Sequence, residues 1–147
     1  MVTPQRIHGI DVALVKAAIC RAERLTSGEI RVAVARYYFW GKVDRAAQHA
    51  FKRLRIAHTR QRNGVLIFVA PRRRELAVIG DVGINERVPA AFWRELVDTV
   101  GAHSKKGELT AGLVDAVARV GTILAEIFPP LPGVNVNELP DTVVALP

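Results

Sequence analysis

Two short apolar runs within residues 63–86 constrain the fold more than any other part of the chain. Val65–Ala70 is an unbroken apolar run, rich in β-branched and aromatic residues and bounded by a glycine and a proline. It is too short for an ordinary helix, so it predicts a strand buried on both faces. A second run, Leu76–Ile79, follows after the short connection Pro-Arg-Arg-Arg. The two runs therefore predict an antiparallel hairpin.

Periodic apolar positions predict a first strand and four helices around this hairpin. The expected elements are a helix over Asp11–Arg24, a strand over Ile30–Ala35, and helices over Val43–Leu54, Val88–Val100 and Leu109–Ile127. Gly101 is expected to end the third helix. Because strand, helix and strand follow one another, the first two strands should be parallel with a right-handed crossover. The predicted fold class is α/β: a three-layer α-β-α sandwich, Rossmann-like, with a small mixed sheet made of a βαβ unit plus the antiparallel hairpin.

Composition favours one globular domain. The chain has 147 residues and is 50% hydrophobic, which is enough for a sizeable core. We expect the domain to cover residues 1–130 and a Pro- and Asn-containing tail to cover 131–147, either extended across the domain or disordered. The single cysteine excludes an internal disulfide framework. The N-terminus does not resemble a signal peptide and no apolar run could span a bilayer, so the expected location is cytoplasmic.

Several motifs, taken in order, resemble the TPM domain family, which has thylakoid-lumen, bacterial and nematode branches. They are Thr26–Arg31, Arg62–Ile67, Ile79–Ile84, the pair Phe92-Trp93, and Asn137–Asp141. The similarity is to the compact bacterial form of the domain. It implies an α/β sandwich, divalent-metal binding, and an acid-phosphatase activity attributed to a plant branch. Many relatives carry a signal sequence or a membrane anchor, and this sequence differs from them because it shows neither pattern.

Three polar residues are expected at one edge of the sheet. Glu29 enters the first strand, Asn63 enters the second, and Asp81 leaves the third, which runs antiparallel to the second. Calcium and magnesium bind such oxygen ligands. We expect Asp81 to be the first ligand and Glu29 the second, with Asn63 orienting the turn. The alternative is that Gly-Asp-x-Gly is a simple turn in which Asp81 accepts backbone hydrogen bonds.

A phosphatase at this edge would need the metal to polarise the phosphate and activate water. Asp81 is then the candidate catalytic residue, as ligand or base. The sequence shows no independent nucleophile and no phosphate-cradling glycine loop, so no organic cofactor is expected. Whether the chain is an enzyme stays open.

The opposite edge has a different chemistry. Arg36 ends the first strand and is followed by Tyr37, Tyr38 and Trp40, and the hairpin tip carries Arg72–Arg74. Arginines beside aromatics suit a nucleic acid or another polyanion. The formal net charge of +7 points the same way. The simpler interpretation is that the aromatics pack on the second helix and the charges are a solvated surface.

A third interpretation is a non-catalytic scaffold domain, since some branches of the family resemble accessory factors of membrane complexes. Its partner would be a protein, whereas the enzyme interpretation calls for a phosphate ester. The tail motif Asn137–Asp141 would dock on such a partner or, more simply, on its own domain.

Overall fold

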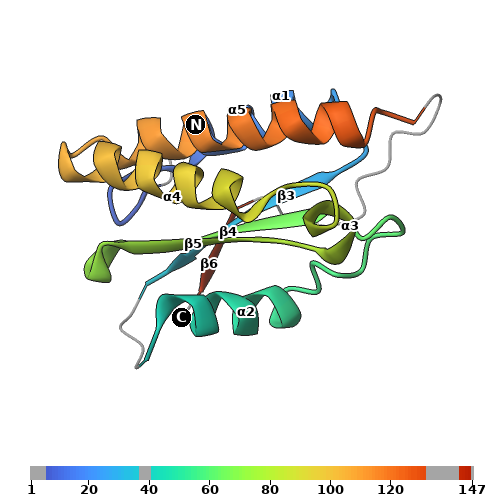
Figure 1. Ribbon diagram of the computed structural model, residues 1–147. Helices are drawn as coiled ribbons and strands as arrows, with labels where there is room; N and C mark the ends of the chain where they lie inside the picture. The colour runs from blue at the N-terminus through green and yellow to red at the C-terminus, as the bar shows by residue number, and fades with distance from the viewer. Residues whose placement is uncertain (1–5, 37–40, 132–142, 147) are drawn as a thin grey trace.

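A four-stranded mixed sheet lies in the middle of the molecule, with helices on both faces (Figure 1). The computed structural model describes residues 6–36, 41–131 and 143–146. The sheet strands are β3 (Glu29–Ala35), β4 (Gly64–Ala70), β5 (Glu75–Gly80) and β6 (Val143–Leu146). The helices are α1 (Val12–Glu23), α2 (Val43–Arg53), α3 (Val82–Asn85), α4 (Ala90–Lys105) and α5 (Leu109–Ile127). The predicted three-layer sandwich is confirmed.

The strand order is β5-β4-β3-β6. β3 pairs in parallel with β4, and β4 pairs antiparallel with β5. The crossover through α2 and the tight hairpin are therefore those that the apolar runs predicted. A 3-10 turn, η1 (Pro71–Arg73), forms the hairpin tip.

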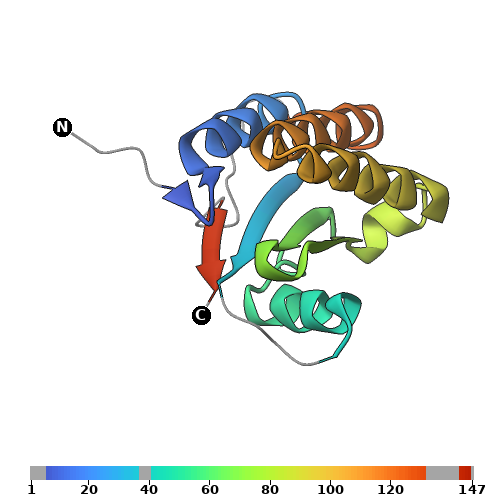
Figure 2. The ribbon, with the colours of Figure 1, turned by 90° about the vertical axis from the view of Figure 1, so that its left-hand side faces the viewer.

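The two faces of the sheet are covered unequally. α1, α4 and α5 cover one face, and α2 alone covers the other (Figures 1 and 2). The alternation along β3 sends Ile30, Val32 and Val34 into the large core under the three helices, and Ala33 and Ala35 into the smaller core under α2. Both central strands are buried along their whole length, which explains why they appear in the sequence as continuous apolar runs.

Four features differ from the sequence expectations. Arg6–Ile7 and Ile10–Asp11 form a small antiparallel hairpin, β1–β2, where we expected only a lead into the first helix. The short helix α3 follows β5, where we expected only a turn. α4 runs through Gly101, which we expected to end it, to Lys105. At the chain end, β6 pairs in parallel with β3 and adds a strand that we did not expect, although an extended tail was one of the two alternatives. None of the helices in the described ranges is long and apolar enough to cross a membrane.

Gly64 tests the packing beneath the crossover helix. A Cβ added to Gly64 would lie 2.7 Å from both Cγ2 and the carbonyl oxygen of Ile56, which is fully buried. Gly64→Ala should therefore destabilise the protein by about 1–3 kcal/mol through overpacking. Gly101→Ala is the matched control, because its Cβ would meet nothing within 4 Å, and it should stabilise α4 by about 0.5–1 kcal/mol. Urea unfolding of both variants checks this, and equal effects would contradict the packing argument.

Candidate functional site

The edge of the sheet where β4 begins and β5 ends is held by an ion pair. Arg62 Nε donates to Asp81 Oδ2 at 2.7 Å, and Arg62 Nη2 donates to Asp81 Oδ1 at 2.8 Å. Asp81 Oδ1 also accepts from the Val82 backbone N–H at 2.8 Å, which caps α3. Hydrogen bonding to Asp81 raises the pKa of the Arg62 guanidinium, and the nearby charge adds to this. Both oxygens of the predicted first metal ligand are thus bonded to groups of the protein.

Close backbone contacts surround this ion pair. The Gly83 N–H donates to the Arg62 carbonyl at 3.0 Å, and a Cβ on Gly83 would lie 2.7 Å from that oxygen. The Asp81 N–H donates to the Gly64 carbonyl at 3.0 Å. A Cβ on Gly80 would lie 2.7 Å from the Trp93 ring. The residues of the Arg62–Ile67 and Ile79–Ile84 motifs therefore hold the loop and the turn against each other.

The structure places Glu29, Asn63 and Asp81 at this same edge, and all three are buried. Glu29 and Asp81 flank Gly64 on opposite sides, because Glu29 pairs with it in the register and the Asp81 N–H bonds to its carbonyl. Adjacent strands are about 4.8 Å apart, so β3 and β5 lie roughly 10 Å apart. Ile56 packs on Gly64 between them. The two carboxylates are therefore separated by β4.

The side-chain amide of Asn63 has a hydrogen-bond acceptor that is unused within the described residues. Its Nδ2 donates to Ser27 Oγ at 3.4 Å, whereas its buried Oδ1 receives no hydrogen bond from the described part of the chain. Residues 6–36, 41–131 and 143–146 contain no group of three or more His, Cys, Asp or Glu side chains able to hold a metal ion. Calcium or magnesium would find few free oxygens here, and tight binding needs several.

A half-buried glutamate, Glu23, lies next to this edge, at the end of α1. Glu23 Oε2 accepts from the Ile30 N–H at 2.8 Å. Burial raises the pKa of Glu23 to about 7, against the opposing effect of that hydrogen bond, while the charge of Glu29 raises it further and that of Arg31 lowers it. Neither the sequence pattern nor the spacing of carboxylates identified Glu23, because its burial depends on the packing of α1 against β3.

The opposite edge carries the predicted arginines. Arg36, Arg72 and Arg74 are exposed, and Arg73 donates to Glu75 Oε1 at 3.0 Å through Nη2. Arg74 has φ 54° and ψ 40°, a left-handed conformation that costs a non-glycine residue roughly 1–2 kcal/mol. The aromatic residues Tyr37–Trp40 and the tail motif Asn137–Asp141 lie outside the described residues.

Positive charge is concentrated in the α2 layer. Arg36 and residues 41–62 together hold eight Lys and Arg against one acidic residue, Asp44. All eight basic side chains are exposed: Arg36, Lys42, Arg45, Lys52, Arg53, Arg55, Arg60 and Arg62. Residues 82–127, which form α3 to α5, hold five basic and six acidic residues. The net charge of the whole chain does not show that the positive charge lies mainly in the α2 layer. Counting the charges separately for each predicted layer of the sandwich would have shown it.

The comparison with known families now decides the assignment. The model of the TPM domain matches residues 7–123. The chain belongs to the TPM family. Its resemblance to that family in the sequence is thereby confirmed, and the Arg62–Asp81 ion pair shows that part of the motif has a structural role.

Two solved structures show the same TPM fold. The BA42 protein from the psychrophilic bacterium Bizionia argentinensis is 36% identical, with 91% of this chain and 90% of that one covered and a TM-score of 0.81. The N-terminal domain of the cg2496 protein from Corynebacterium glutamicum is 13% identical, with 77% and 70% covered and a TM-score of 0.60. The second likeness concerns the fold alone. No curated protein matches the sequence.

The raised pKa of Glu23 makes the stability of this TPM domain depend on pH. The folded state holds the proton up to about pH 7, against an ordinary pKa of 4.5 for a glutamate side chain. The contribution of Glu23 to stability is therefore full below about pH 4.5 and is lost as the pH rises through 7. Glu23→Gln should raise the melting temperature by a few degrees at pH 8 and change it little near pH 4.5.

Thermal unfolding of the Glu23→Gln protein at both pH values provides the measurement. Glu95→Gln, at an exposed position on α4, is the control and should have little effect at either pH. An equal shift at both pH values would show that titration of Glu23 is not the cause.

Proposed function

We propose that this TPM domain is a non-catalytic binding module for a phosphate-backbone polyanion, with nucleic acid as the class of partner. The observation that carries the proposal is the exposed basic surface formed by Arg36 and residues 41–62, hereafter the α2 basic surface. It stands against the nearly balanced charge of α3 to α5. If the excess of positive charge served solubility alone, it would not need to be concentrated in the α2 layer.

The geometry of α2 suits contacts with phosphates. Arg45 and Lys52 are seven residues apart, so they lie on the same face of the helix, away from the buried Ala47 and Ala50. Arg36 and the arginines of the hairpin tip lie at the end of the sheet where α2 begins (Figure 1). Phosphate contacts from Lys and Arg give affinity without base specificity.

Metal-dependent phosphatase chemistry has less support from the geometry. Its candidate catalytic residue, Asp81, bonds through both oxygens to Arg62 and also caps α3. Those contacts give the carboxylate a role in holding the β4–β5 edge together. We therefore derive no hydrolytic step.

Binding of a labelled single-stranded oligonucleotide, followed by anisotropy at about 50 and 200 mM salt, tests the proposal. The double variant Arg45→Glu/Lys52→Glu should bind at least about tenfold more weakly, because each lost phosphate contact weakens binding and makes the affinity less dependent on salt. The control, Arg94→Glu/Lys106→Glu, makes the same charge change on α4 and at its C-cap and should weaken binding far less.

Three results would count against this function. Equal losses in the two double variants would mean that only net charge matters. Absence of binding at the lower salt would remove the proposal. Binding of anionic lipid vesicles without binding of the oligonucleotide would assign the surface to a membrane instead.

A second candidate function is weak binding of calcium or magnesium at the β4–β5 edge, and the free Oδ1 of Asn63 favours it. We propose that a cation there competes with Arg62 for Asp81, with Oδ1 of Asn63 as a further oxygen donor. Glu29 lies beyond β4 and is not part of this donor set. The Arg62 side chain is 48% exposed, so it can leave the carboxylate without breaking the core. The donor set is small, and binding should therefore be weak.

Calcium titrations followed by NMR test this competition. Arg62→Gln should bind calcium more tightly than the unmodified protein, because Asp81 then loses its guanidinium partner. Arg62→Gln/Asp81→Asn should lose that gain. If the amides around Asp81 stay unchanged in Arg62→Gln at millimolar calcium, this edge is not a cation site.

A further inference from the structure

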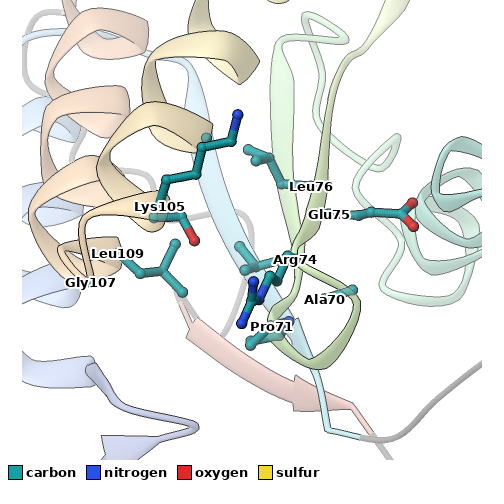
Figure 3. A pocket seen from close by; sticks show the side chains of 11 residues that line it. Ala70, Pro71, Arg74, Glu75, Leu76, Lys105, Gly107 and Leu109 are labelled. Atoms are coloured by element: carbon teal, nitrogen blue, oxygen red, sulfur yellow. The ribbon is translucent and has the colours of Figure 1, made fainter.

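A cavity of about 450 Å³ opens between the tip of the β4–β5 hairpin and the turn that joins α4 to α5 (Figure 3). Its apolar walls come from both sides and include Val69, Ala70, Leu76 and Leu109. Cavities of this size, apolar with a few polar groups, are typical of sites for small organic molecules. We call it the hairpin–turn pocket.

Two cationic side chains line the hairpin–turn pocket, Arg74 from the hairpin and Lys105 from α4. Neither forms an ion pair within the residues that the structure describes. The acidic groups of the two segments are already engaged, since Glu75 accepts from Arg73 at 3.0 Å and Glu108 lies 3.4 Å from His103 Nδ1. In Figure 3 the Glu75 side chain points away from Lys105. The pocket therefore has two positive charges that no described carboxylate neutralises.

In the view of Figure 3 the Lys105 amino group and the Arg74 guanidinium group lie apart, and the side chains of Leu76 and Leu109 lie at heights between them. Ser104 also lines the pocket and can donate a hydroxyl hydrogen bond. A guanidinium group binds a carboxylate through two parallel hydrogen bonds, whereas an ammonium group acts as a point charge. We propose that the hairpin–turn pocket binds a small organic dianion, two carboxylates joined by a short apolar spacer.

The backbone at Arg74 offers a variant that separates the charge from the fold. Arg74 has a left-handed conformation, φ 54° and ψ 40°, at the end of the turn η1. Glycine adopts that conformation without a steric penalty, so Arg74→Gly removes the guanidinium group without straining the turn.

This site is separate from the α2 basic surface. Lys105 belongs to α4, on the other side of the sheet from α2 (Figure 1). The ligand is a small molecule held between two walls, whereas a polyanion would lie along an exposed helix. The inference therefore goes beyond the proposed function and does not depend on it.

Titration of the labelled protein with glutarate, followed by NMR, tests the proposal. The amides of Gly107 and Leu109 should shift, and Arg74→Gln and Lys105→Gln should each weaken binding by about tenfold or more. Lys106→Gln is the matched control, since Lys106 is the adjacent exposed residue and does not line the pocket, and it should leave the affinity within about twofold. Glutaramide, which lacks the charges, and butyrate, which has one carboxylate, should bind more weakly than glutarate.

The opposing results are distinct. No shifts at Gly107 and Leu109 with millimolar glutarate, or equal weakening by Lys106→Gln, would overturn the site. Tighter binding of inorganic phosphate would overturn the dicarboxylate class. Arg74→Gly should lose glutarate binding while keeping or raising the melting temperature, whereas a lower melting temperature would show that Arg74 is structural. Arg45→Glu/Lys52→Glu should bind glutarate normally, which separates this site from the α2 basic surface.

Discussion

The close approach of the loop before β4 to the turn after β5 is the constraint on which this end of the TPM domain depends. Gly64 and Gly83 allow the approach because neither carries a side chain, and the ion pair between Arg62 and Asp81 also joins the two segments. With these two segments fixed, β4 and β5 keep their antiparallel register and α3 begins at its cap, Asp81. The hydrogen bonds from Arg62 occupy both oxygens of the carboxylate that a metal site would need. The Ile79–Ile84 motif of the family therefore has a structural role in this protein.

The sandwich then separates two kinds of surface. α1, α4 and α5 pack together over a large core, and their exposed residues include acids and bases in similar numbers. α2 covers the other face alone, with small buried residues and long exposed basic ones. A single amphipathic helix needs only a narrow apolar stripe, which leaves most of its circumference for charge. The consequence is a basic surface whose Arg36 end lies beside the hairpin arginines, at the end of the sheet where ligands of α/β folds commonly bind.

The surroundings of a charged group also change its properties in two places in this protein. Glu23 and Glu29 lie near each other beside β3 with Arg31 close by, and the loss of water around Glu23 disfavours its charge. At the opposite end of the sheet, Arg74 and Lys105 face a cavity rather than acidic partners. The pocket joins residues far apart in the chain, whereas Glu23 and Glu29 are close in sequence; in both arrangements the effect comes from the surroundings of the group.

The sequence by itself determined the three strands β3, β4 and β5, their directions and the layer order. Continuous apolar runs such as Val65–Ala70 can be stable only where both faces are covered, and short connections leave few topologies. It also brought Glu29, Asn63 and Asp81 to one edge. Only the tertiary structure decided the partner of Asp81, the burial of Glu23, the pairing of β6 with β3, and the continuation of α4 through Gly101. These depend on contacts between distant residues, and local periodicity carries no information about which side chains will meet.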